Sequence, residues 1–182
     1  ADQVTEEKIR LLAEAGCNHC WFGLECGDQD FANTELKRNL KNTQFVEVAR
    51  LLRKYEIPFM TQNITALPSD DPIATDAKTI DVNIRCKPDF AMAHIYFPFL
   101  RTELGQYTLS KGLFKETDKL DSRDAMHSPL SFPDKTKRIL ERQRNMFSFF
   151  VLFPEFRPLL PIMRRLPLDS LYTKLFGAMA SY

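Results

Sequence analysis

Apolar residues along positions 1–114 follow two alternating periods, one typical of amphipathic helices and one typical of buried strands. The helical spacing predicts helices over 5–15, 28–36, 43–55, from 72 onward, and over 102–111. Short apolar runs predict strands over 18–25, 57–64 and 89–97. This alternation predicts an α/β fold in which parallel strands are joined by right-handed helical crossovers.

Capping residues support several of these helix ends. Thr5 suits the N-cap of the first helix, and Gly16 suits its end. Asn42 or Thr43 can cap the helix over 43–55. Asp71 followed by a proline predicts the start of the next crossover helix.

The pattern changes after about residue 115. A charged linker over 115–133 precedes a predicted helix over 134–153, which is polar at first and strongly apolar later. Prolines then divide the chain into short helical pieces that end with 168–180. We therefore expect a βα-repeat half-barrel over 1–114, a linker over 115–133 and a helical tail over 134–182.

Three parallel strands form a poor sheet by themselves, because parallel sheets are normally covered on both faces. We expect a partner here, either the missing N-terminal half of a barrel or a second copy that pairs through an open sheet edge. Charged residues and prolines interrupt the apolar stretch 146–168, so it is not a spanning helix. The sequence favours packing of this stretch over peripheral contact with a membrane.

Composition narrows the class of protein. The chain has 182 residues, 44% of them hydrophobic and 27% charged, with a net charge of +1. These values suit one soluble globular domain, and the near-neutral charge gives no indication of nucleic-acid binding. Four cysteines and no visible signal peptide predict a reducing, cytoplasmic location.

Glu25 is the most prominent candidate for a ligand contact. It ends an apolar strand and is flanked by Gly23 and Gly27, which would let a ligand approach the backbone closely. In βα-repeat proteins, ligand-binding residues collect at the C-terminal ends of strands. A solvated carboxylate in a turn is the alternative. The basic residues Lys37, Arg38 and Lys41 follow, either as anion ligands or as a solvated face.

Three other groups of residues carry potential chemistry. Cys17 and Cys20 form a CxxC motif, but a helix leads into a strand there, so buried structural cysteines are favoured over a redox or zinc site. The run 61–63 (Thr-Gln-Asn) either binds a ligand or caps the next helix. His94 lies within a strand, where a hydrogen-bonded core residue is favoured over a base or ligand.

Taken together, several segments resemble the second half of a radical S-adenosylmethionine domain. The branch that they resemble most is the cobalamin-associated one that includes the anaerobic magnesium-protoporphyrin monomethyl ester oxidative cyclases. The resemblance covers roughly residues 1–135. Its segments, in order, are 11–25 (helix and "GIESG"-like strand), 41–52 ("K-x-T" and helix), 63–68 ("GLPGET"-like turn), 88–105 ("PD…PxxGT.L"-like strand and turn) and 128–133 (the linker after the barrel).

The resemblance implies a partial TIM-like (βα)6 barrel in the parent enzyme. In this family a 4Fe-4S cluster cleaves S-adenosylmethionine to a radical that abstracts hydrogen from the substrate, here a hydrophobic compound such as a tetrapyrrole. The resemblance implies that Glu25 and Gln62 contact the ribose and that Lys41 contacts the methionine carboxylate. It also implies that the backbone of Ala66 and Leu67 lines the adenosine site.

The chain departs from this family in ways that limit its chemistry. It contains no CxxxCxxC cluster motif and no "GGE"-type motif, and no cobalamin-binding domain. Ala66 stands where the family has glycine, and 69–71 (Ser-Asp-Asp) stands for "GET". We therefore expect a fragment of a radical S-adenosylmethionine enzyme that is not catalytically competent alone. The alternative is a non-catalytic βα association module that docks through its Phe-rich tail.

Overall fold

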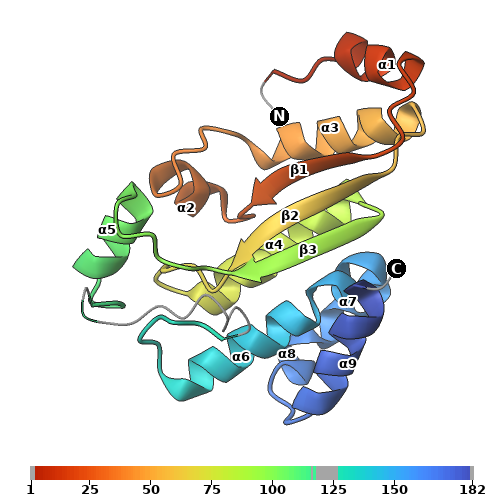
Figure 1. Cartoon of the computed structure of the whole chain (residues 1–182). Coiled ribbons are helices and arrows are strands. Elements are labelled where there is room, and N and C mark those ends of the chain that lie inside the picture. The colour runs from red at the N-terminus through yellow and green to blue at the C-terminus, as the bar shows by residue number, and fades with distance from the viewer. Residues whose placement is uncertain (1–2, 116, 118–126, 181–182) are drawn as a thin grey trace.

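The described part of the chain, residues 3–115, 117 and 127–180, is an α/β structure in this computed structural model (Figure 1). Three parallel strands form one sheet in the order β1-β2-β3. They span Cys20–Glu25, Phe59–Thr65 and Phe90–Ile95. The predicted alternation of helices with parallel strands is therefore confirmed for these residues.

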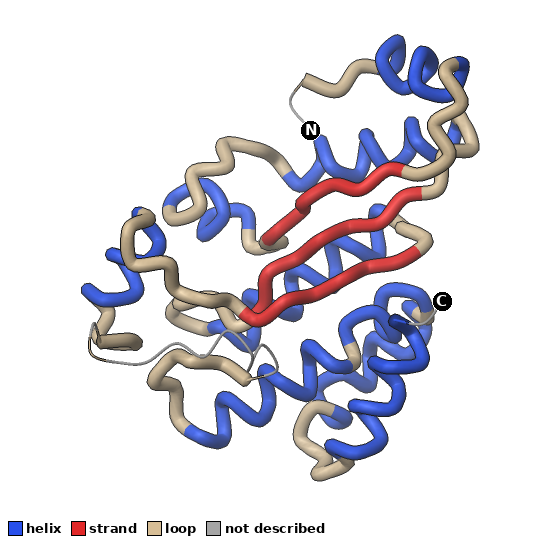
Figure 2. Tube along the Cα trace, viewed as in Figure 1, coloured by secondary structure: helices blue, strands red, loops and turns tan. Residues whose placement is uncertain are grey.

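Helices alternate with the strands, and the two longest helices between strands cover one face of the sheet. In order they are α1 (Glu6–Glu14), α2 (Gln29–Thr34), α3 (Asn42–Lys54), α4 (Pro72–Cys86) and α5 (Glu103–Ser110). Figures 1 and 2 view the sheet from its other side, with α4 behind the strands. Thr5 caps α1 and Asp71 caps α4, each by accepting a hydrogen bond from a backbone amide. Both caps were predicted from the sequence.

The main core lies between this covered face and α3. Leu24, Leu52 and Phe59 are almost fully buried there. Phe22 stacks between Phe45 and Phe59, with ring centroids 6.3 Å and 5.6 Å away. Burying side chains of this size stabilises the fold by about 1.5–3 kcal/mol each. This packing fixes β1 and β2 against the crossover helix.

The C-terminal region packs on the sheet as a helical layer. Its elements are α6 (Asp134–Asn145), α7 (Phe147–Leu152), the 3₁₀ helix η1 (Pro154–Leu159), α8 (Leu160–Met163) and α9 (Asp169–Ala180). Ser148 donates to the carbonyl of Ala91 at 2.5 Å, and Arg144 Nε donates to that of Ala93 at 3.3 Å. The tail thus packs along the edge of β3, and β1 forms the other edge of the sheet.

Several predicted boundaries differ from the structure. The helix predicted over 134–153 is divided at Met146, whose φ of −95° and ψ of 1° interrupt the helix between α6 and α7. The helix predicted over 43–55 begins at Asn42, so Lys41 takes the N-cap position without a side-chain capping bond. Most of the predicted linker, residues 116 and 118–126, lies outside the described residues. None of the described helices combines the length and apolar content that crossing a membrane requires.

Candidate functional site

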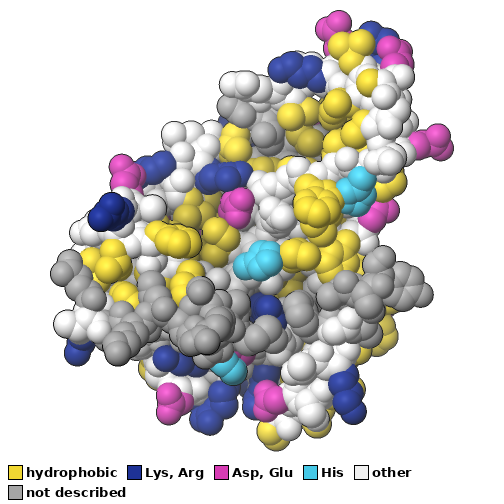
Figure 3. All heavy atoms as spheres, viewed as in Figure 1, with side chains coloured by type: hydrophobic (Ala, Val, Ile, Leu, Met, Phe, Trp, Pro, Cys, Tyr) yellow, Lys and Arg dark blue, Asp and Glu magenta, His cyan; other side chains and the backbone are white. Residues whose placement is uncertain are grey.

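The candidate site lies at the C-terminal ends of the strands, on the face of the sheet that no described helix covers. Toward the N-terminal ends of the strands the same face is apolar, because Trp21 is 65% exposed and Phe90 is partly exposed, as is Met92 in the middle of β3. Figure 3 shows apolar side chains gathered over this face, with acidic, basic and histidine side chains among them. A partly apolar surface with a few polar groups is typical of ligand-binding sites.

Glu25 ends β1 in a left-handed conformation, with φ at 67°. Its carboxylate folds back over Gly23, because a Cβ added at position 23 would lie 2.0 Å from Glu25 Oε1. The missing side chain at Gly23 therefore makes room for the carboxylate over the helix-free face. The pairing register shifts between these two residues, which is how a local irregularity redirects a side chain.

Arg38 is the cation that the fold brings to this carboxylate. Its Nη2 donates to the Gly23 carbonyl at 2.7 Å, and its Nη1 lies 3.7 Å from Glu25 Oε1. Burial raises the pKa of Glu25, and the nearby guanidinium opposes that shift. Lys41 is exposed at the start of α3, where its backbone amide donates to Gln44 Oε1. In the sequence, Arg38 and Lys41 are equivalent members of one basic run. The structure distinguishes them, because Arg38 contacts Gly23 and Glu25 whereas Lys41 is exposed at the start of α3.

The polar run 61–63 divides between the two faces of the sheet. Thr61 and Asn63 are buried on the covered face and bond to Asn83 of α4, at 2.5 Å and 2.7 Å. Gln62 points to the other face and pairs in register with Gly23 and Met92. Neighbouring strands lie about 4.8 Å apart. The amide of Gln62 therefore lies on the strand next to the Glu25 carboxylate, whereas its two neighbours hold α4 in place.

The turn after β2 is held by a buried carboxylate that sequence analysis missed. Ala66 has a φ of 56°, a conformation that favours glycine. Its backbone amide donates to both oxygens of Asp76, at 3.1 Å and 3.2 Å. Asp76 is fully buried, which raises its pKa well above the usual value. Leu67 is also fully buried beside it. In the sequence, the one indication of this buried carboxylate is that Asp76 stands among the apolar positions of a predicted helix.

His94 lies on the helix-free face rather than in the core, contrary to the favoured interpretation of the sequence. Its side chain is exposed, and it pairs in register with Ile64 of β2. Partial desolvation lowers its pKa, and the positive charge of Arg144 lowers it further. His94 is therefore largely neutral at pH 7, with ring nitrogens that can donate and accept hydrogen bonds. It shares this face with Met92, which lies two residues earlier on β3.

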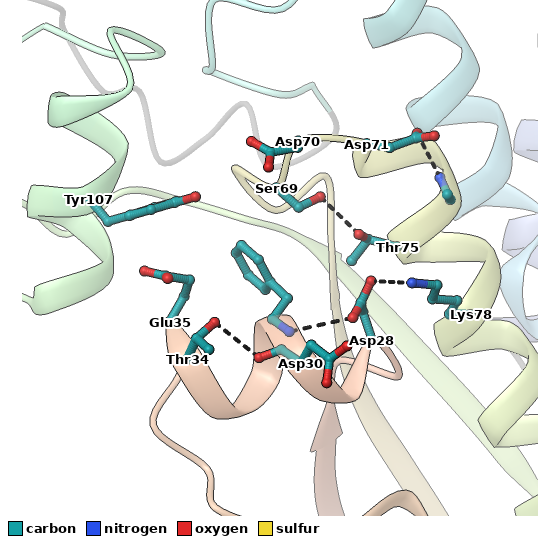
Figure 4. Close-up of a pocket in the computed structure, with 12 residues that line it drawn as sticks. Asp28, Asp30, Thr34, Glu35, Ser69, Asp70, Asp71, Thr75, Lys78 and Tyr107 are labelled. Carbon is teal, nitrogen blue, oxygen red and sulfur yellow. Dashed lines mark hydrogen bonds and ion pairs between the residues drawn. The ribbon is translucent and has the colours of Figure 1, made fainter.

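Away from the Glu25 face, a cavity of about 350 Å³ opens between α2, the turn before α4, and α5 (Figure 4). Its acidic side chains mostly have structural partners. Asp28 caps α2 and pairs with Lys78 at 2.6 Å, and Asp71 caps α4. Asp70 pairs with Lys111 at 2.9 Å. The described residues contain no group of three or more potential metal ligands. Helix caps and ion pairs therefore account for three of its five acidic side chains, Asp28, Asp70 and Asp71.

No protein-family model matches this chain, and no curated protein matches it. The geometry of the site offers a carboxylate, an amide and a neutral imidazole at one end of a partly apolar sheet face. Such a set is suited to binding the hydroxyl and amide groups of an uncharged polar ligand that has an apolar ring.

Proposed function

We propose that this chain is the C-terminal half of a radical S-adenosylmethionine barrel and that its helix-free sheet face lines the barrel interior. The observation that carries the proposal is the juxtaposition of Glu25 and Gln62 on adjacent strands of that face. Three parallel βα units with one uncovered face are what half of a (βα)6 barrel would present. The missing strands would pair with the free edge of β1.

The residues fit the nucleoside part of S-adenosylmethionine. The Glu25 carboxylate can accept hydrogen bonds from ribose hydroxyls, and the Gln62 amide can donate or accept. Ala66 and Leu67 form the buried turn after β2, and the positive φ of Ala66 suits the glycine that the family has there. Lys41 keeps its proposed role toward the methionine carboxylate, although Arg38 lies closer to Glu25. Bound S-adenosylmethionine would supply the precursor of a 5′-deoxyadenosyl radical.

The residues do not fit a 4Fe-4S cluster. Such a cluster requires three cysteines on one loop in this family, whereas the cysteines here stand at 17, 20, 26 and 86. Cys26 and Cys86 are buried at 1% and 0% exposure. We therefore assign no radical step to this chain and propose that a complementary half carries the cluster. Cobalamin, which the resemblance implies for the parent enzyme, is assigned no residues.

The proposal is tested by titrating the full chain with 5′-deoxyadenosine and S-adenosylmethionine while recording amide NMR spectra. We expect weak binding, with a dissociation constant on the order of 1 mM, because half of the site is missing. The shifts should centre on Glu25, Gln62 and Ala66. Glu25→Gln should weaken binding about tenfold or more, since a hydrogen bond to a charged group is lost.

Glu47→Gln is the matched control, because Glu47 is an exposed carboxylate on α3 that pairs with Arg50. It should leave binding unchanged. Equal weakening by both variants, or shifts confined to other surfaces, would contradict the proposed site. Low-micromolar binding by the chain alone would contradict the idea that the site is incomplete.

A docking function for the tail is the second candidate, and the exposure of the tail's apolar residues favours it. The last turns of the chain present a continuous series of exposed large side chains: Phe153, Phe156, Leu159, Ile162, Leu166, Leu168 and Leu171. Their exposed fractions lie between 40% and 60%. Exposed apolar patches of this kind mark association surfaces. We call these seven residues the tail patch.

Sedimentation velocity over a range of concentrations tests this candidate. If the tail patch drives association, the wild-type chain should sediment faster as concentration rises, and Leu159→Ser with Ile162→Ser should abolish that increase. Leu11→Ser with Leu12→Ser is the matched control, because these leucines of α1 are also exposed, at 49% and 41%. Concentration-independent sedimentation of the wild type, or equal effects of both double variants, would argue against docking through the tail patch.

A further inference from the structure

Cys17 and Cys20 bring their sulfur atoms within 3.7 Å of each other. Cys17 follows α1 in a turn that contains Gly16 with a φ of 79°, and Cys20 begins β1. Both side chains are half-buried rather than buried, contrary to the interpretation favoured from the sequence. A disulfide bond is about 2.05 Å long, so the two sulfurs need to approach by less than about 2 Å.

The surroundings of the pair exclude two other uses of a CxxC motif. In thioredoxin-like enzymes the first cysteine stands at a helix N-terminus, which stabilises its thiolate. Cys17 instead follows the C-terminal end of α1, so no helix N-terminus faces its sulfur. A metal site is also unsupported, because the described residues contain no group of three or more candidate ligands. Contact between two accessible thiols then leaves disulfide formation as the chemistry that the geometry favours.

We propose that Cys17 and Cys20 form a reversible disulfide that fastens the end of α1 to the start of β1. The bond would constrain the turn between them, which Gly16 and the contact between Cys17 and the His19 carbonyl now shape. Helix α1 has few other attachments. Ile9 is its buried residue, and Glu6 pairs with Lys54 and Tyr55 of the α3 region. Oxidation should therefore restrict the motion of α1 against α3.

The reaction balances with a low-molecular-weight disulfide, RSSR, as the oxidant. The thiolate of Cys17 attacks RSSR, which forms a mixed disulfide and releases one RS⁻. Cys20 then loses its proton and attacks the Cys17 sulfur, which releases the second RS⁻. The two cysteines lose two electrons and two protons, and RSSR becomes two RSH. Burial, and then the hydrogen bond with Cys17, raise the pKa of Cys20 to about 11, which suits the resolving rather than the attacking role.

The other two cysteines provide an internal contrast. Cys26 and Cys86 are buried in the core at 1% and 0% exposure, whereas Cys17 and Cys20 are only half-buried and can meet a dissolved disulfide. They stand too far along the chain from the pair to belong to the same turn, and the structure places Cys26 near Asp28 and Cys86 at the end of α4. Oxidation should therefore be selective for Cys17 and Cys20.

The test equilibrates the full chain in buffers with different ratios of reduced to oxidised glutathione, and then traps free thiols with an alkylating reagent. Mass spectrometry should show loss of two of the four alkylatable thiols, with one peptide linkage between Cys17 and Cys20. Trp21, the one tryptophan of the sequence, lies next to Cys20 and should change its fluorescence along the same titration. Amide exchange in α1 should slow in the oxidised chain.

Cys17→Ser and Cys20→Ser should each abolish the fluorescence change and the internal linkage, whereas Cys86→Ala should preserve both. Four alkylatable thiols at every glutathione ratio would overturn the proposal. Oxidation that stops at a mixed disulfide between Cys17 and glutathione would also overturn it, because Cys20 would then fail to resolve the intermediate. Both readouts are made on the wild-type chain, so they do not depend on the folding of a variant.

Discussion

Phe150→Ala should destabilise the whole chain by about 3–5 kcal/mol. Phe150 lies on α7 and is fully buried in a cluster with Ile80 of α4 and Ala91 of β3. Removing its ring would leave a cavity where the tail meets the sheet, and neighbouring residues are too constrained to fill it. Total stabilities of domains are commonly about 5–15 kcal/mol, so this loss is a large fraction. Urea unfolding followed by circular dichroism measures it.

Phe153→Ala is the matched control, because Phe153 is three residues further along and 40% exposed. Its main ring contact is with Phe149, at a centroid distance of 5.4 Å, so its loss should cost about 1 kcal/mol or less. If the two substitutions have equal effects, the tail does not share a core with the strands. A single unfolding transition in the wild type, shifted as a whole by Phe150→Ala, would show that tail and sheet unfold together.

Asp76→Asn should remove the free-energy cost of ionising a buried carboxyl, a cost that lowers the stability of the wild-type fold as pH rises. Burial raises the pKa of this carboxyl above its unfolded value of about 3.9, so the native state binds its proton more tightly than the unfolded state. The stabilisation from this proton is complete below the unfolded pKa and is lost as pH rises toward and through the folded pKa. The asparagine side chain keeps an oxygen for the Ala66 amide and cannot ionise. The stability of the variant relative to the wild type should therefore increase as pH rises above about 4.

Thermal unfolding at several pH values between 4 and 8 tests this expectation. Asp76→Ala separates ionisation from hydrogen bonding, because it also removes the acceptor of the Ala66 amide and should cost about 1–3 kcal/mol at the acid end of this range. Asp30→Asn, at an exposed position of α2, should leave the pH profile parallel to that of the wild type. Parallel profiles for Asp76→Asn and the wild type would show that Asp76 is not held protonated by the fold.

The local order of elements could be predicted because it depends on short-range signals. Apolar periods of two types marked the strands and crossover helices, and Thr5 and Asp71 marked helix starts through bonds to amides three residues away. These predictions succeeded because each depends on residues that are close together in the sequence. The common face of Gly23, Gln62 and His94, in contrast, followed only from the strand register of the sheet.

Only the tertiary structure decided which residues from distant parts of the sequence contact one another. The basic run near residue 40 gave no reason to prefer Arg38, and its contact with Gly23 and Glu25 arises because α2 and the following loop fold back on β1. Asp76 became a structural carboxylate because α4 packs against the turn at Ala66. The tail proved to cover the edge of β3, which no local pattern encodes. Pairings between distant segments depend on how apolar surfaces are buried together, so the sequence determined the elements and their faces, and packing determined their partners.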